Sequence, residues 1–211
     1  MKSITIITCG QKYNQSRYIA DSMKRVFPGN VAIVELGQKL PDTDYFLWCD
    51  SGCCYEIDTP KEKTIFLAID SHIRNKRDSW YIEVARNSKY LFDATSNGDG
   101  INWFATNGII AYNMPLGFSQ DHFYYEDLPK KYEIMWCGGR RFDGLRGKIL
   151  ELVRKNFNLY ECDSNTNPLI YNDSLRTLIN SSKVFLEISP LEKNYIGQRF
   201  WEGMVCRTNM V

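Results

Sequence analysis

The sequence is short of histidine, of net charge and of long apolar segments, and each shortage excludes a class of protein. Only two of the 211 residues are histidine, which leaves little material for a zinc centre. The formal net charge is +1, whereas a protein that coats nucleic acid has a clear basic excess. No apolar run approaches the roughly 20 residues that span a bilayer. We therefore expect no membrane span and no general nucleic-acid coating, while a local basic groove for nucleic acid stays open.

The cysteines indicate a reducing compartment. Residues 1–10 lack the apolar core of a secretory signal peptide, so the seven cysteines are expected to be reduced thiols in a cytoplasmic protein. Cys49, Cys53 and Cys54 lie close enough in sequence to suggest zinc, but no second cysteine pair lies at ligand spacing. We expect buried small hydrophobic side chains rather than a metal site.

The first half of the chain alternates apolar runs with helical stretches. Each run is short, continuous and bounded by turn residues, as in parallel strands that are buried on both faces. Strands are expected at residues 4–8, 31–34, 45–49, 64–69 and 90–93, and helices at 16–27, 78–88 and 100–107, with a further apolar run at 109–112. This alternation is typical of a doubly wound α/β domain.

The second half repeats the pattern after a polar and aromatic connector at residues 118–131. Strands are expected at residues 132–137, 158–160 and 184–188, and helices at 144–156, 174–181 and from 199 onward. Residues 208–211 look like the opening of another strand. The sequence thus predicts a first domain at 1–117, the connector, and a second, incomplete domain at 132–211.

Polar residues follow the strands of the first domain, where parallel sheets bind ligands. Gly10, Lys12 and Asp50 are candidates for binding an acceptor. Asp70 and His72 follow the 64–69 run and are candidates for a general base, a task that suits the ordinary pKa of histidine. The alternative is structural: an aspartate that caps a helix and a histidine that bonds a loop carbonyl. The other histidine, His122, lies in the connector and is expected to be structural or exposed.

The second domain carries candidates for binding a nucleotide. Arg199 and Glu202 are expected to be exposed in the first turns of a helix, where the backbone field would keep the carboxylate ionised and able to accept hydrogen bonds from a ribose diol. The alternative is a carboxylate that serves only the helix dipole. Phosphate groups could be bound by the turn after the 132–137 strand and by nearby cations, Gly138, Gly139, Arg140 and Arg146. A solvated basic helix face would explain the same cations.

Residues 199–204 (RFWEGM) resemble the donor site of GT-B glycosyltransferases, and most of all the CgeB-like and family-4-like groups. There a pattern close to R-x-F-E-x-x-x-x-G opens the donor-binding helix, and Arg199, Phe200 and Glu202 match it when Trp201 is an inserted or substituted position. Shorter likenesses lie at residues 70–73, 114–116 and 138–139. The resemblance implies two Rossmann-like domains, a nucleoside-diphosphate sugar as co-substrate, no metal, and a shortened second domain.

Three functions follow, in this order. The first is a glycosyltransferase that uses a nucleoside-diphosphate sugar, with a glycan ranked above a modified DNA base as acceptor. The second is a non-catalytic GT-B-like module that binds a nucleotide or nucleotide sugar. It is favoured by Arg207 at the usual glycine and by Asn194 at the usual second carboxylate of the family-4 pattern. The third is a two-domain α/β interaction protein.

Overall fold

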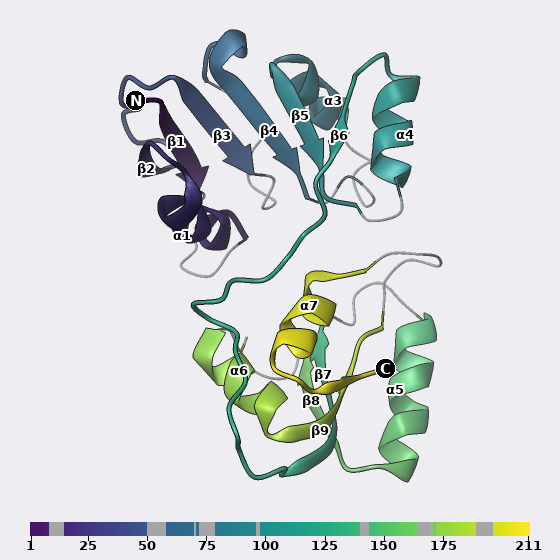
Figure 1. Ribbon diagram of the computed structural model, residues 1–211. Coiled ribbons are helices and arrows are strands. Elements are labelled where there is room, and N and C mark those ends of the chain that lie inside the picture. Colours follow the sequence, from purple (N-terminus) through teal and green to yellow (C-terminus); the bar gives the residue numbers. More distant parts are fainter. Residues whose placement is uncertain are drawn as a thin grey trace. The chain divides into compact units, whose positions relative to one another are not determined.

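The computed structural model describes residues 1–8, 15–49, 58–69, 71, 79–95, 98–139, 144–163, 170, 172–188 and 196–211 (Figure 1). Its contacts divide the chain into two compact units, Met1–Leu116 and Gly117–Val211. Each unit has its own parallel β-sheet and its own buried apolar clusters. Within the described ranges, every helix is too short or too polar to cross a lipid bilayer.

The first unit is built on a six-stranded parallel sheet in the order β2-β1-β3-β4-β5-β6. In its register, Ile4 of β1 faces Val31 on one side and Tyr45 on the other. The strands are β1 (Ser3–Thr8), β2 (Asn30–Glu35), β3 (Tyr45–Cys49), β4 (Thr64–Ala68), β5 (Tyr90–Asp93) and β6 (Tyr112–Asn113). The helices between them are α1 (Gln15–Val26), α3 (Ser79–Arg86) and α4 (Asp99–Thr106), with a 3₁₀ turn, η1 (Lys61–Lys63), before β4.

Helices cover both faces of this sheet, because successive residues of a strand point to opposite sides. Trp48 packs in one cluster with Tyr81 of α3 and Phe104 of α4. Its neighbour Leu47 packs in the other cluster with Ala20 of α1. The continuous apolar runs of the sequence therefore mark strands that are buried on both faces.

The second unit has a four-stranded parallel sheet in the order β10-β9-β7-β8. Met135 and Phe185 pack on one face with Leu175 of α6, and Trp136 packs on the other with Leu150 of α5. The strands are β7 (Tyr132–Gly138), β8 (Leu159–Asp163), β9 (Ser182–Leu186) and β10 (Asn209–Met210). The helices are α5 (Gly144–Asn156), α6 (Asn172–Asn180) and α7 (Gln198–Val205).

The parallel sheets confirm the predicted α/β class with two Rossmann-like units. The strand expected to open at residues 208–211 is β10, which pairs in parallel with β9. The run at 109–112 is strand only at its last residue. Ile109 packs instead against the core of the first unit, its amide bonded to the carbonyl of Phe104, and Ile110 is exposed.

The cysteines in the described part of the chain are buried, as expected of small hydrophobic side chains. They are Cys49, Cys137, Cys162 and Cys206. Cys9, Cys53 and Cys54 lie outside the described residues. The structure therefore does not test whether a metal site forms around them.

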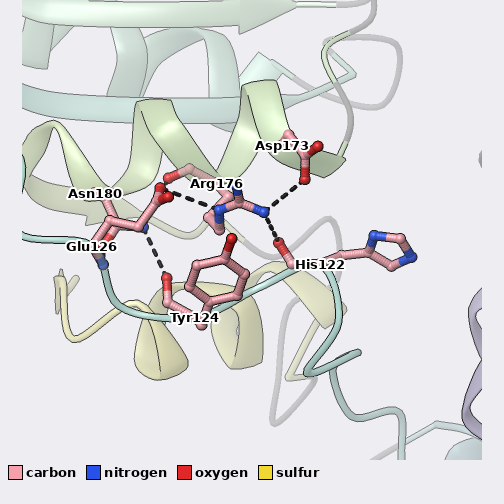
Figure 2. A network of polar contacts seen from close by, with 6 residues as sticks. All are labelled: His122, Tyr124, Glu126, Asp173, Arg176 and Asn180. Atoms are coloured by element: carbon pink, nitrogen blue, oxygen red, sulfur yellow. Dashed lines mark hydrogen bonds and ion pairs between the residues drawn. The ribbon is translucent and has the colours of Figure 1, made fainter.

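Residues 118–131 are held against α6 by Arg176 (Figure 2). Its Nε donates to Oε2 of Glu126 at 3.2 Å and its Nη1 to the carbonyl of His122 at 3.1 Å. The guanidinium carbon lies 4.1 Å from the ring centroid of Tyr124. The imidazole ring of His122 points away from this network, which uses only the backbone of that residue (Figure 2).

Asn180, one turn further along α6, completes the attachment. Its Oδ1 accepts from the amide of Glu126 at 2.9 Å and its Nδ2 donates to the carbonyl of Tyr124 at 3.0 Å. Lys130 donates to the carbonyl of Asn180 at 2.7 Å. The segment that the sequence presents as a connector is therefore bonded along its length to the second unit.

Replacing Arg176 with methionine should lower the free energy of unfolding by about 2–3 kcal/mol, because Glu126 and the His122 carbonyl would lose a charged donor in a largely buried place. Denaturant-induced unfolding measures this loss. Arg154→Met is the matched control: its half-exposed side chain pairs with Glu161, and exposed pairs contribute about 0–1 kcal/mol. Equal losses in the two variants would contradict the attachment.

Candidate functional site

The carboxyl ends of β7 and β9 lie side by side at the switch point of the second sheet. The chain leaves β7 for β8 on one side and returns to β9 on the other. Parallel α/β sheets bind ligands beside such a point. Gly138 closes β7 and Gly139 follows it, Glu187 and Ile188 follow β9, and α7 comes next in the described chain. This edge is the candidate donor site.

Arg146 joins the two strand ends through their backbone. Its Nη1 donates to the carbonyl of Gly139 at 2.6 Å, and its Nε and Nη2 donate to the carbonyl of Ile188 at 3.1 and 2.7 Å. The guanidinium lies 5.9 Å from the Trp136 ring. Arg146 is buried on α5, so it fixes the geometry of the edge and leaves a positive charge there. A contact between Arg146 and phosphate stays a prediction.

Gly138 is packed closely against this arrangement. A Cβ atom at this position would lie 2.9 Å from the indole ring of Trp136. The glycine therefore lets the backbone pass over the same ring that faces Arg146. Its predicted role beside a phosphate group is untested, and so is that of Gly139.

Glu202 lies inside the second unit, so the expectation of an exposed carboxylate is wrong. Its side chain is 0% exposed, and that of Arg199 is 28% exposed. Because α7 begins at Gln198, Glu202 is in the second turn, beyond the reach of the backbone field at the helix start. The opposing charge is instead Arg199, whose Nη1 donates to Oε2 of Glu202 at 2.6 Å.

Burial and ion pairing act on Glu202 in opposite directions. Burial raises the pKa of its carboxyl group above the ordinary value, while Arg199 and, more weakly, a polar contact from Gln198 oppose the rise. The second oxygen, Oε1, is buried and has no hydrogen-bond partner within the described part of the chain. Leaving such an acceptor unpaired costs about 1–3 kcal/mol, which a hydroxyl donor from a ligand would recover.

Glu187 adds a second carboxylate to this edge. Burial raises the pKa of its carboxyl group, Arg199 and Arg146 lower it, and Glu202 raises it. Glu187 therefore lies in the electrostatic field of two arginines and a second acid at the end of β9. Sequence reasoning missed Glu187, because its position at the end of an apolar strand gives no sign of what faces it.

Gly203 lets α7 lie close to β9 and β10. A Cβ atom there would be 2.7 Å from Cδ1 of Phe185 and would collide with Sδ of Met210. A larger side chain would push α7 away from the sheet, and Glu202 would move with it. The glycine that follows Glu202 is therefore part of what places the carboxylate.

Arg207 occupies a backbone conformation that favours glycine, which is the residue of the family pattern at this position. Its φ is 54°, in the left-handed region. The amides of Arg207 and Thr208 bond the carbonyls of Met204 at 3.0 Å and Gly203 at 3.2 Å, which is the Schellman end of a helix. The Arg207 guanidinium lies 5.1 Å from the Tyr125 ring. The turn that the pattern requires is thus present despite the substitution.

A third buried carboxylate, Asp93, lies at the end of β5 in the first unit and was also missed. It is 0% exposed and accepts hydrogen bonds from the hydroxyl groups of Ser71 and Thr95. Its only signal in the sequence is an acid that closes an apolar run. No group of three or more His, Cys, Asp or Glu side chains in the described ranges could hold a metal ion.

Six predicted site residues lie outside the described part of the chain. Strands β1 and β3 are neighbours at the switch point of the first sheet, where Gly10 and Lys12 follow one strand and Asp50 the other. The roles assigned to these residues stay predictions, as do those of the remaining three, Asp70, His72 and Arg140.

Two of the three comparisons found nothing: no protein-family model matches the chain, and no curated protein matches it in sequence. Solved structures do match over almost the whole chain. A mutant of T4 phage β-glucosyltransferase in complex with UDP-glucose gives a TM-score of 0.62 at 15% identity and covers 98% of this chain and 79% of its own. The fold is that of the GT-B glycosyltransferases.

Two further structures share this GT-B fold. One is the DNA-modifying enzyme β-glucosyltransferase with and without uridine diphosphoglucose, at a TM-score of 0.60 and 14% identity over 99% of this chain and 78% of that one. The other is an α-glucosyltransferase in complex with UDP and a 13-mer DNA that contains an HMU base. Its TM-score is 0.58 at 9% identity, over 99% of this chain and 79% of that one. The narrower likeness to the CgeB-like and family-4-like groups stays a prediction.

Replacing Glu202 with glutamine should change how stability depends on pH. Because burial raises the folded-state pKa above the unfolded value, the carboxyl group contributes stability that is present below the unfolded pKa and lost as pH rises through the folded pKa. The stability of the wild type relative to Glu202→Gln should therefore fall as pH rises from about 4, near the unfolded pKa, into the neutral range. Thermal unfolding of both proteins across this range measures it, and a rise would contradict the assignment.

Arg207→Gly and Arg207→Ala should differ in stability although both remove the contact with Tyr125. Of these two replacements, only alanine is strained at a φ of 54°, by roughly 1–2 kcal/mol. The glycine variant has a more flexible unfolded chain, which lowers its stability and offsets part of this difference. We expect the glycine variant to be the more stable by about 1 kcal/mol in denaturant unfolding. Equal stability would show that the left-handed turn does not persist in solution.

Proposed function

We propose that the protein is a glycosyltransferase that moves a sugar from a nucleoside-diphosphate sugar to an acceptor hydroxyl group. The shared fold with glucosyltransferases supports the class. The observation that carries the proposal is the buried Glu202, held by Arg199 and with one oxygen unpaired among the described residues. Such a carboxylate suits a ribose, whose two hydroxyl groups are donors.

The donor would bind along the edge where β7 and β9 end. Arg199 favours the charged form of Glu202 and so strengthens its hydrogen bonds to a ribose. The diphosphate would lie toward Gly138, Gly139 and Arg140, with the charge of Arg146 behind the strand ends. UDP-glucose is the first donor to test, because structures of this fold bind UDP-glucose or UDP.

The reaction needs a base on the acceptor side and positive charge on the donor side. Asp70 or His72 would take the proton of the acceptor hydroxyl group as its oxygen bonds to the anomeric carbon of the sugar. The bond from that carbon to the diphosphate breaks, and the nucleoside diphosphate leaves with the electron pair. Cations and strand-end amides stabilise the charge that develops on the phosphate.

A hydroxymethylated base in DNA is the acceptor that we propose to test before a glycan. The glycan ranks first on sequence alone, but two of the matching structures are a DNA-modifying enzyme and an enzyme bound to DNA with an HMU base. Gly10, Lys12 and Asp50 would bind the acceptor at the switch point of the first sheet. The formal net charge of +1 requires that any attraction for DNA be local.

The second candidate function, a module that binds nucleotide without catalysis, rests on two departures from the family pattern. One of them is Arg207, which keeps the left-handed turn at the end of α7 that the family pattern forms with glycine. This departure therefore supports the binding module less than the sequence alone suggests. The other, Asn194, lies outside the described residues.

UDP and UDP-glucose should stabilise the protein against thermal unfolding, by about 2.7 kcal/mol at ~100 times the dissociation constant. Glu202→Gln should abolish this shift, whereas Glu161→Gln on β8 should keep it. Transfer of labelled glucose to DNA with hydroxymethylated bases is then measured. Stabilisation without transfer to DNA or to glycans would favour the binding module, and no stabilisation by any nucleotide would overturn both functions.

A further inference from the structure

Asp93 is a buried carboxylate that no cation neutralises among the interactions found in the described part of the first unit. It closes β5 and has no exposed surface. Its oxygens accept from the hydroxyl groups of Ser71, on Oδ1, and of Thr95, on Oδ2, and the backbone of Thr95 adds a further hydrogen bond. Burying a carboxylate without a cationic partner costs free energy even when it accepts hydrogen bonds. This free-energy cost indicates that Asp93 has a role other than packing.

The surroundings of Asp93 are shaped to hold this arrangement. A Cβ atom on Gly100, in the first turn of α4, would collide with Oδ1 of Asp93 and Oγ of Ser71, so only glycine fits. The Gly100 amide donates to Oγ1 of Thr95 at 3.3 Å. Asn113 of β6 donates to the carbonyl of Thr95 at 2.8 Å. Three elements, β5, α4 and β6, therefore meet at this carboxylate.

The partner that matters for function is Ser71. It is fully buried and follows β4 by three residues, while Asp93 pairs in register with Ala68 at the end of that strand. The residues on either side of Ser71 in the sequence are Asp70 and His72, the two candidate general bases. A hydrogen bond that fixes the Ser71 side chain restrains the backbone of Ser71, to which both neighbours are covalently bonded.

We propose that Asp93 is a positioning residue of the transfer reaction, which acts through the hydroxyl group of Ser71 on the backbone of Ser71, the sequence neighbour of Asp70 and His72. The proposal rests on the proposed function. Asp93 does not touch the substrate in this role. Small errors in the placement of a reacting group cost on the order of a hundredfold in rate, so the loss of one such bond should be visible in turnover.

The test compares Ser71→Ala with Ser88→Ala. Both serines are buried in the first unit and both hydroxyl groups donate one hydrogen bond, that of Ser88 to the carbonyl of Val84 at 2.9 Å. Steady-state kinetics with UDP-glucose and hydroxymethylated DNA should show kcat lowered on the order of a hundredfold in Ser71→Ala, with the KM for UDP-glucose within about twofold. Ser88→Ala should leave both constants near those of the wild type.

Two further measurements keep the outcomes separate. Ser71→Cys fills nearly the same space with a weaker donor and should give a kcat between those of the wild type and the alanine variant. Hydrogen exchange of peptides that contain Ser71 should quicken in Ser71→Ala and not in Ser88→Ala. An active wild type with an unchanged kcat in both Ser71 variants would overturn the positioning role alone. A wild type that binds nucleotide but transfers no sugar would overturn the function on which the role rests.

Discussion

The burial of the Glu202 carboxyl group is the constraint on which the second unit depends. Glu202 has no exposed surface, so only Arg199 favours its charge strongly against burial, and the carboxyl group stays buried only while α7 keeps its short distance from the sheet. Gly203 permits that distance, and the left-handed turn at Arg207 ends the helix. Arg146 then fixes the strand ends beside which the pair lies. The packing of α7, the turn that ends it and the backbone bonds of Arg146 together determine where the Glu202 side chain lies.

The two units bury their carboxylates in different ways, and the difference fits different tasks. Asp93 has both oxygens bonded to hydroxyl groups of its own chain, which leaves it complete and suited to holding other parts in place. Glu202 has one oxygen bonded and the other without a partner in the described ranges, which leaves it suited to a ligand. A guanidinium partner also keeps the charge available, because an ionised acceptor forms the stronger hydrogen bonds.

The sequence predicts the strands and the fold class well and the site only in part, for a physical reason. Runs such as 45–49 are apolar throughout because both faces of their strand are covered, and that is a local signal. Whether Glu202 is exposed depends on how α7 is rotated against β9. That rotation cannot be predicted from the local sequence pattern. The contact between Ser71 and Asp93 joins residues 22 positions apart, and each alone is an ordinary polar residue at a strand end. The motif at residues 199–204 points to Glu202 as a site residue. Only the structure shows that the side chain of Glu202 is buried.

The attachment of residues 118–131 to α6 shortens the linker between the two units. Leu116 packs against a core cluster of the first unit, and Phe123, 1% exposed, packs in one of the second. Ser119 accepts backbone hydrogen bonds from His122 and Phe123, which close a turn. The fourteen residues that the sequence presents as a connector therefore belong mostly to the second unit, and only a few residues separate the last side chain packed on one core from the first side chain packed in the other.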